Sequence, residues 1–396
     1  MSRVWVDVFD SNGDSLDNAY GPVLLESATI THMLDGSGGI KLAYPASVRG
    51  RELLMAGRSI KVWYETEEGN ILLGEGIIKK SVSGAADCQD LLEELKYDNT
   101  LLNYQIDMLT VQAAISGLIG ALGWTVEASG TALTATASEV FDGETKLKAL
   151  LLVAEHSGTH VRLSPRGGRV MEVGNFGERN DITLFDASSG AGGDAWSGVF
   201  ESLTIEEQSE QLINRILPVG GAFSGGANVT LASSTRTGIS TIAGQDGALN
   251  YYIENAASVA LYGVRWGYKT YPDIKPLAAG APAETACANQ LYDAAAVDLA
   301  NLSVIRRNFK GKVRGLKTQL LPGDAVRVLY NEPIYDDNGD LWSGGALDEY
   351  LYITRVETYA GEGGWWQNID LSNVNALRID EATDVANAVA ANKKAT

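Results

Sequence analysis

Alternating apolar and polar residues at both ends of the chain restrict its fold more than any other pattern. Residues 1–85 contain RVWVDVFD, the Asn-Gly turn of SNGD, and IKVWYETEEGNILLGEGIIKKSVSG, which predicts three further strands. The block from residue 303 onward contains several more alternating strands, including DAVRVLY and EYLYITRVETYAG. We therefore expect a mainly β protein with a β block at each end.

Three segments between these blocks have helical periodicity instead. TVQAAISGLIGALGW predicts an amphipathic helix with Thr110 as its N-cap and Gly123 as its stop, and ETKLKALLLVAEHSG predicts a second helix that ends at Gly158. APAETACANQLYDAAAVDLANL is the clearest helix, because it is rich in alanine and has Pro282 near its start. The middle of the chain is therefore predicted to be α+β.

The net charge argues against a nucleic-acid-binding protein. The 396 residues are enough for two to four domains, and 50 acidic against 31 basic residues give a net charge of −19. A chain with this balance repels phosphate. The N-terminus lacks an apolar signal core, and MLTVQAAISGLIGALGW is too short and too interrupted by glycine for a membrane span. We expect a soluble, non-secreted chain that does not insert into a membrane.

Two Asp/Asn-rich turns, DSNGD at 10–14 and DDNGD at 336–340, are interpreted as exposed hairpins. Each begins like a calcium loop, but the positions that require Gly and Glu hold Ser15 and Gly21 in the first turn and Leu341 and Leu347 in the second. The surrounding stretches VFDSNGDSL and IYDDNGDLW also resemble each other. Their similarity leaves open the hypothesis that the two β blocks are related domains.

No other motif predicts a metal, a cofactor or an active site. His156 and His160 flank a glycine that breaks the helix needed to bring them to one face, and Cys88 and Cys287 are too far apart in sequence for a zinc or disulfide motif. The chain has no Walker motif, no Gly-x-Ser-x-Gly elbow and no nucleotide-fold glycine fingerprint. We therefore expect no metal, no cofactor and no catalytic residue.

Cys88 is the residue on which an enzyme hypothesis depends. It lies in ADCQDLLEEL at the expected start of a helix, where a thiol pKa can be depressed, and His160 follows on a predicted strand. Peptidoglycan-cleaving cysteine peptidases have such an arrangement, usually within Asp-Cys-Ser-Gly. Here Gln89 and Asp90 follow Cys88, and acidic neighbours raise a thiol pKa. A cell-wall cysteine peptidase with Cys88 as nucleophile stays an alternative.

Aromatic residues concentrate in two places that we interpret as packing or interface segments. Residues 256–274, AASVALYGVRWGYKTYPDI, interleave aromatic and basic residues as a single-stranded nucleic-acid surface does. The acidic balance of the chain weakens the nucleic-acid interpretation, and the alternative is a segment of a packed β protein. The adjacent tryptophans at 365–366 are expected to point to opposite faces of a strand, although either could stack on a sugar. The candidate interface residues are Tyr262, Arg265, Trp266, Lys269, Trp365 and Trp366.

Five stretches, taken in chain order, carry a family resemblance. LLGEGIIKKSVSGAADCQDLLEELKY is similar to a strand that leaves a first barrel, and TVQAAISGLIGALGWTVE to a helix and Gly-Trp that open an insert. TIEEQSEQLINRILPVGG is similar to a return strand, SVALYGVRWGY to a segment before a long helix, and LLPGDAVRVLY to the Pro-Gly-Asp turn of a last-barrel strand. In this order the chain resembles the hub proteins of tailed-phage baseplates and tail tips. The resemblance implies that the aromatic segment is a connector into the helix at Pro282, in which the aromatics pack and Arg265 or Lys269 makes subunit or domain contacts.

The resemblance implies a mainly β fold with α+β insertions, in which smaller inserted modules separate two tail-tube-like β-barrel domains. It places the first barrel at residues 1–100, completed by 197–222, and the second at 303–376. The implied remainder is an inserted α+β domain at 101–196, a connector module at 223–302 and a C-terminal tail at 377–396.

The resemblance also implies a function and partners. Three copies of a two-barrel chain would form a trimeric ring of six barrels, which adapts a six-fold tail tube to a three-fold tip and lines the DNA exit channel. The implied partners are the chain itself, a distal tail or tail tube protein, the tape-measure protein end, a tip, spike or fibre protein, and DNA as passing cargo. Such a protein resides in the virion tail after assembly in the host cytoplasm. A tail-borne cysteine peptidase and a carbohydrate-binding tail component are the alternatives.

Overall fold

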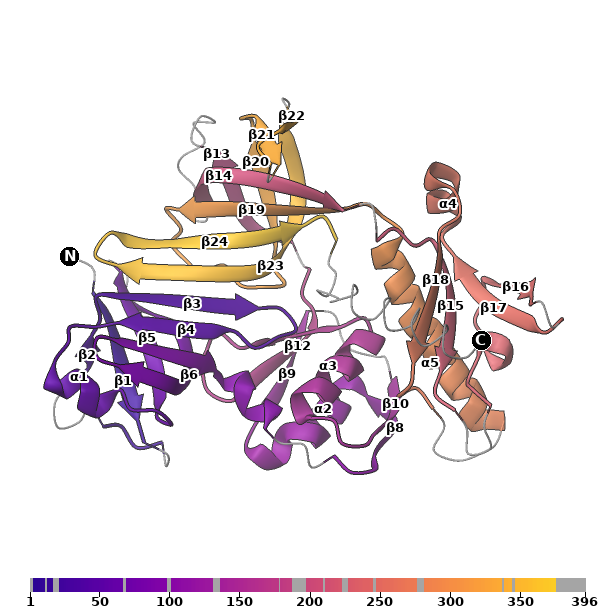
Figure 1. The fold of residues 1–396 in the computed structure, drawn as a ribbon, viewed down its shortest axis with the longest axis horizontal. Helices are drawn as coiled ribbons and strands as arrows, with labels where there is room; N and C mark the ends of the chain where they lie inside the picture. Colours follow the sequence, from indigo (N-terminus) through magenta and orange to yellow (C-terminus); the bar gives the residue numbers. More distant parts are fainter. Residues whose placement is uncertain are drawn as a thin grey trace.

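Strand pairing divides the chain into two β-barrels and two α+β modules, which are visible in Figure 1. The computed structural model describes residues 3–10, 13–16, 21–66, 69–97, 101–130, 136–177, 179–186, 197–208, 211–222, 227–244, 247–275, 281–336, 338–343 and 346–374. The expected C-terminal tail at 377–396 lies outside these residues. The predicted fold class, mainly β with two barrels and α+β insertions, is confirmed.

The first barrel is built from the N-terminal β block. Its strands follow the order β2-β1-β5-β6-β7-β4-β3, and Val4, Val6 and Val8 point into its core, as the alternating sequence predicts. β2 and β3 follow each other in the chain, and β2 pairs with β1 whereas β3 pairs with β4. The segment formed by β2 and β3 therefore connects the last strand of the sheet back to the first. The elements are β1 (Val4–Phe9), β2 (Val23–Leu24), β3 (Ser27–Met33), β4 (Gly39–Ala43), α1 (Val48–Leu53), β5 (Ser59–Thr66), β6 (Gly69–Val82) and β7 (Ala85–Asp90).

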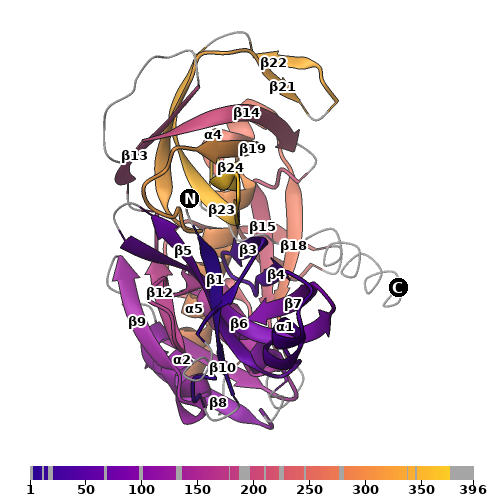
Figure 2. The same ribbon diagram turned by 90° about the vertical axis from the view of Figure 1, so that its left-hand side faces the viewer.

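The second barrel is closed. Its strands follow the cycle β23-β20-β13-β14-β19-β24, and β24 pairs back with β23. A hairpin, β21–β22, extends from it beside β14 (Figure 2). The elements are β13 (Arg179–Asp186), β14 (Ser197–Gln208), β19 (Arg306–Arg314), β20 (Ala325–Tyr330), β21 (Ile334–Asp336), β22 (Leu341–Ser343), β23 (Leu347–Gly361) and β24 (Gly364–Ser372).

Both barrels have the same strand order. When the strands are matched in sequence order, β1, β3, β4, β5, β6 and β7 correspond to β13, β14, β19, β20, β23 and β24, and each barrel follows the same cycle of neighbours. One difference is direction, because β1 is antiparallel to β5 whereas β13 is parallel to β20. The two similar turns do not correspond: 10–14 follows β1, whereas 336–340 lies between β20 and β23. The barrels therefore match through topology rather than through these hairpins.

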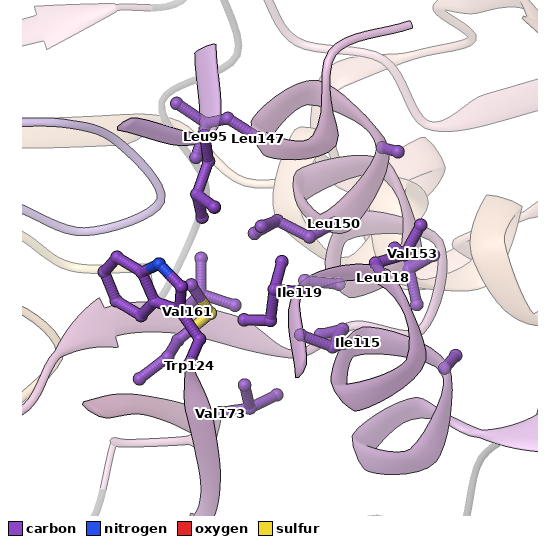
Figure 3. Packing of buried hydrophobic residues seen from close by; sticks show 14 of the residues in the cluster. Leu95, Ile115, Leu118, Ile119, Trp124, Leu147, Leu150, Val153, Val161 and Val173 are labelled. Carbon is purple, nitrogen blue, oxygen red and sulfur yellow. The ribbon is translucent and has the colours of Figure 1, made fainter. Parts of the chain in front are cut away.

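The first module follows the first barrel directly. Helices α2 and α3 pack on the sheet β11-β12-β9, and the leucines of η2 join their core (Figure 3). The predicted caps are confirmed, because Thr110 accepts a hydrogen bond from the Ala113 N–H and Gly123 has a left-handed conformation. The elements are η2 (Leu91–Lys96), β8 (Tyr104–Thr110), α2 (Val111–Ile119), η3 (Gly120–Leu122), β9 (Thr125–Gly130), β10 (Thr136–Phe141), α3 (Lys146–His156), β11 (His160–Leu163) and β12 (Val170–Asn175).

The second module interrupts the second barrel between β14 and β19. Its sheet follows the order β16-β17-β15-β18, and the long helix α5 packs against it. Even this longest of the described helices does not have the apolar character that a membrane span requires. The elements are β15 (Arg215–Gly220), η4 (Leu231–Ser233), β16 (Ile239–Ala243), β17 (Leu249–Glu254), α4 (Ala256–Tyr262), β18 (Trp266–Tyr271) and α5 (Ala281–Leu302).

The expected return of 197–222 to the first barrel is wrong. β14 pairs with β13 and β19 of the second barrel, and β15 pairs with β17 and β18 of the second module. The second barrel therefore begins with β13, inside the segment assigned to the first insert, and not at residue 303. The first module also starts near residue 91 rather than 101, because Leu91, Leu92 and Leu95 pack in its core. Alternation predicts strands but not their partners, and this ambiguity explains the error.

Candidate assembly surfaces

The two barrels share a continuous seam. β3 of the first barrel and β23 of the second pair antiparallel over seven residue pairs, from Met33 with Arg355 to Ser27 with Gly361. Figure 1 shows the two strands side by side. Trp365 packs against the cores of both barrels, and its ring lies 6.3 Å from that of Tyr64. Backbone pairing and a shared aromatic side chain thus hold the barrels edge to edge.

Trp366 makes a different set of contacts from those of Trp365. Its ring stacks on Tyr359 with 3.9 Å between centroids, and the cations of Lys312 and Arg314 lie 4.8 and 5.2 Å from its centroid. These contacts come from the neighbouring strands β23 and β19. A role for Trp366 in a contact between subunits stays a prediction.

Arg162 of β11 joins the first module to the second barrel. Its guanidinium donates to Glu172 at 2.9 Å, to Asp324 at 2.8 Å and to the carbonyl of Pro322 at 2.8 Å, and it lies 4.2 Å from the Phe176 ring centroid. Burial raises the pKa of Asp324, and the Arg162 charge opposes this. The Pro-Gly-Asp turn at 322–324, which the sequence predicted, thus forms the second barrel's side of its junction with the first module.

Asp35, in the turn after β3, joins the first barrel to strand β11 of the first module. Its carboxylate lies 2.8 Å from Nδ1 of His160 and accepts a 2.8 Å hydrogen bond from the Val161 N–H. The Asp35 N–H in turn donates to the Val161 carbonyl at 3.0 Å. Burial raises the pKa of Asp35, and the hydrogen bond with His160 opposes this. β11 therefore contacts both barrels through neighbouring residues.

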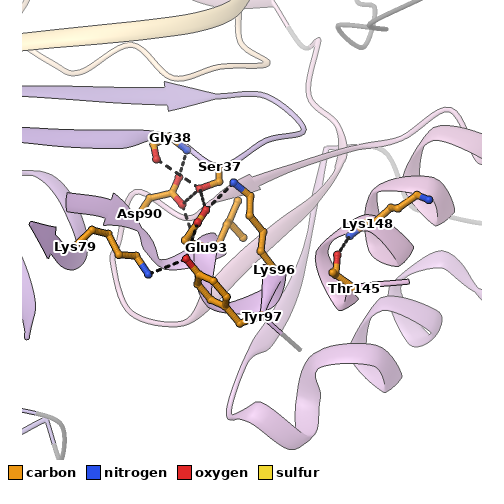
Figure 4. A network of polar contacts seen from close by, with 10 residues as sticks. Ser37, Gly38, Lys79, Asp90, Glu93, Lys96, Tyr97, Thr145 and Lys148 are labelled. Atoms are coloured by element: carbon orange, nitrogen blue, oxygen red, sulfur yellow. Dashed lines mark hydrogen bonds and ion pairs between the residues drawn. The ribbon is translucent and has the colours of Figure 1, made fainter. Parts of the chain in front are cut away.

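A third junction, shown in Figure 4, lies where β7 leads into η2. The Asp90 carboxylate accepts hydrogen bonds from the Gly38 N–H, from the Ser37 hydroxyl at 2.8 Å and from the Leu92 N–H at 3.1 Å. Glu93 adds an ion pair with Lys96 at 2.6 Å. Asp90 thereby caps η2 and holds the β3–β4 turn.

We expect Asp90 to make stability depend on pH. Burial raises the pKa of Asp90 from 3.8 to about 6, against its hydrogen bonds. Because the folded protein then holds this proton more tightly than the unfolded chain, the contribution is complete below the unfolded pKa and is lost as pH rises through the folded pKa. Relative to Asp90→Asn, which cannot titrate, the wild-type free energy of unfolding should fall by up to about 1.4 kcal/mol per pH unit in that window. Urea denaturation across the window tests this, and a difference that does not change with pH would contradict it.

Buried polar groups also link the two modules. Glu139 of β10 lies 3.2 Å from Nδ1 of His156 and accepts a hydrogen bond from Gln290 of α5 at 3.3 Å. Burial alone would lower the pKa of His156, but the Glu139 carboxylate outweighs it and raises this pKa. Lys269 of β18 pairs with Asp298 at 2.7 Å and lies 3.6 Å from Glu155 of α3. The predicted basic residue at 269 thus contacts both modules within the chain.

The aromatic segment 256–274 is not a simple connector, because it forms α4 and β18. Arg265 is exposed, and Tyr262 and Trp266 are 39% and 44% exposed. The Trp266 ring packs edge-on against Tyr252 at 4.9 Å, and the Arg215 guanidinium lies 5.2 Å from its centroid, so two side chains of the same sheet contact it. A subunit contact through these residues stays a prediction.

Cys88 does not occupy the expected start of a helix. It lies in strand β7, it is 3% exposed in the core of the first barrel, and burial raises its pKa to about 12. The helix begins after Asp90, whose side chain caps it. His160 pairs with Asp35 instead. The structure thus gives the Cys88 thiol none of the exposure or acidity that a nucleophile needs.

The described residues contain no group of three or more His, Cys, Asp or Glu side chains that could hold a metal ion. His156 and His160 pair with carboxylates of different elements, in β10 and in the turn after β3. Sequence reasoning missed these junctions because their partners are distant in sequence: 125 residues separate Asp35 from His160, and 162 separate Arg162 from Asp324.

Solved structures match the chain over nearly its full length, although no family model and no curated protein matches it. The tail protein from Neisseria meningitidis MC58 superposes with a TM-score of 0.59 at 16% identity, covering 94% of this chain and 96% of that one. The 43 kDa tail protein of prophage MuSo2 from Shewanella oneidensis has a TM-score of 0.55 at 11% identity, with coverages of 93% and 98%. Prophage tail protein gp18 from Listeria monocytogenes EGD-e has a TM-score of 0.55 at 12% identity, with coverages of 97% and 98%. The chain therefore has the fold of these phage tail proteins.

Proposed function

We infer that the chain is a structural hub protein of a phage tail tip or baseplate. The observation that carries this proposal is the presence of two barrels with one strand order, joined edge to edge within one chain. The full-length similarity to three tail proteins, two of them from prophages, supports it. A pair of equivalent barrels is the unit needed to place six barrels around a three-fold axis.

In this proposal, three copies form a ring of six barrels. One side of the ring faces the six-fold tail tube or a distal tail protein and the end of the tape-measure protein. The other side holds a three-fold tip, spike or fibre protein. Each subunit contributes one seam of the type that joins β3 to β23, and contacts between subunits supply the other three.

The net charge suits a ring around a DNA exit channel. Three chains carry 3 × −19 = −57 charges. Carboxylates that line a shared channel repel the phosphates of passing DNA and keep it from binding. DNA is then cargo rather than a ligand.

Neither alternative gains support from the geometry. A cysteine peptidase needs an accessible thiol, whereas Cys88 is buried in a barrel core with its pKa raised to about 12. A carbohydrate site needs an open aromatic face, whereas Trp365 packs against both barrel cores and Trp366 stacks on Tyr359.

The oligomeric mass of the purified full-length chain tests the proposal. One chain has a mass of 42.2 kDa, and we expect sedimentation or native mass spectrometry to give three times this value at assembly concentrations. Negative-stain images of the particles should then show six barrels around a three-fold axis. A stable monomer over the whole concentration range, with no binding to tail tube protein, would overturn the proposal.

A further inference from the structure

The internal seam depends on strand β23, which reaches past its own barrel. β23 is longer than its barrel partner β20. Only its first part, Leu347–Tyr352, pairs with β20, and its last part, Arg355–Gly361, pairs with β3. β24 covers the opposite edge of β23. The second half of β23 thus projects past its own barrel neighbour and pairs with the next barrel.

β6, which corresponds to β23, projects in the same way. Its first part, up to Ile77, pairs with β5, and β7 covers its opposite edge as far as Val82. Residues 79–82 therefore extend past the last pairing with β5, as the second half of β23 extends past β20. Lys79 and Lys80 are exposed, and Val82 is 52% exposed. An exposed strand edge of this kind is suited to pairing with another chain.

β14, which corresponds to β3, presents the matching edge. β3 continues from β2, which pairs with β1, and then pairs with β23. β14 likewise pairs with β13 only up to Phe200, while β19 covers its opposite edge to Gln208. In the described part of the chain, the edge of β14 beyond Phe200 pairs with β21 alone, at Thr204 and Ile205. Hairpin β21–β22 thus covers this edge through two residue pairs.

We propose that residues 79–82 of β6 in one subunit pair antiparallel with the edge of β14 beyond Phe200 in a second copy of this chain, and that hairpin β21–β22 gives up this edge on assembly. The inference rests on the proposed trimeric ring. It repeats between chains the contact that β23 makes with β3 within the chain, so that all six seams are of one kind.

Charge complementarity supports a second copy as the occupant. β6 brings Lys79 and Lys80 to the contact, and the far part of β14 carries Glu206 and Glu207. Within the chain, Glu206 lies 3.9 Å from Lys310 of β19, and Nζ of Lys79 lies 3.4 Å from the Tyr97 hydroxyl, so both charges would exchange or share these contacts on assembly. In a chain with a net charge of −19, such a basic strand end favours the acidic strand of a neighbour over a second basic end.

Disulfide trapping tests the strand pairing. We expect Ser81→Cys, combined in separate variants with Ser202→Cys, Thr204→Cys or Glu206→Cys, to give covalent dimers and trimers under mild oxidation in at least one variant. The native cysteines are 3% and 2% exposed, so they give little background. The matched control is Thr31→Cys with Glu357→Cys, a facing pair of the internal seam, which should cross-link within one chain and leave the mass unchanged.

Charge reversal provides a second measurement. We expect Lys79→Glu with Lys80→Glu to weaken the trimer at least about tenfold, and the addition of Glu206→Lys with Glu207→Lys in the same chain to restore it. Lys41→Glu with Arg51→Glu, at exposed positions of the first barrel away from this edge, should leave the trimer intact. Circular dichroism confirms that each variant is folded.

The outcomes separate the inference from the proposed function. A wild-type trimer that none of the three cysteine pairs traps, and that charge reversal leaves unchanged, would overturn the strand pairing and leave the trimer standing. A wild-type chain that never forms trimers would overturn the proposed ring itself. Trapped trimers together with charge-swap rescue would support both.

Discussion

Arg162→Ala should lower the free energy of unfolding by about 3–5 kcal/mol. The side chain is 11% exposed and holds the carboxylates of Glu172 and Asp324, which are 9% and 26% exposed. Removal of the guanidinium leaves the buried Glu172 and the partly buried Asp324 close together without their shared cation, and it also removes the contact with Phe176. Urea denaturation at neutral pH measures the loss.

Arg327→Ala is the matched control for this change. Arg327 makes a bidentate pair with Asp348, with both bonds at 2.9 Å, but the two side chains are 43% and 54% exposed. Solvent screens such a pair, so its loss should leave the free energy of unfolding nearly unchanged. If the two substitutions lowered the free energy of unfolding equally, burial would not be what makes the Arg162 contacts strong.

Trp365→Ala should destabilise the protein by about 3 kcal/mol, because its ring fills space between the cores of both barrels. The adjacent Trp366→Ala should cost less, about 1–2 kcal/mol, because it removes the stacking on Tyr359 and the contacts with Lys312 and Arg314 but no packing between barrel cores. Urea denaturation followed by circular dichroism compares the two variants. A larger loss from Trp366 would contradict the assignment of Trp365 to the barrel seam.

Local signals in the sequence predicted the helices well. Thr110 caps α2, Gly123 ends η3, and Gly158, with a φ of 64°, follows α3. Each of these residues acts on neighbours within a few positions of the chain, so its effect can be read without a partner. The alternation of Val4, Val6 and Val8 likewise predicted a strand with one buried face.

Partners distant in sequence could not be predicted in the same way. The alternating residues of β14 fit either barrel, and only pairing with β13 and β19 assigns them to the second. Cys88 was misplaced because the helical leucines begin three residues later, while the preceding residues alternate as strand β7. The junctions of Arg162 and Asp35 depend on the same long-range pairing of elements. The resemblance implied two tail-tube-like barrels, whereas their strand order emerges only from the pairing of the strands.

The interruption of the second barrel by a whole module has a consequence for synthesis on the ribosome. The first barrel is contiguous through residue 90, so all of its strands emerge together. β13 and β14, by contrast, are synthesised before residues 209–305. The second barrel can close only after its remaining strands, up to β24, have been synthesised. Until then β3 also lacks its partner β23. Nascent chains on one polysome therefore expose unpaired strand edges, which can pair with one another before the barrels are complete.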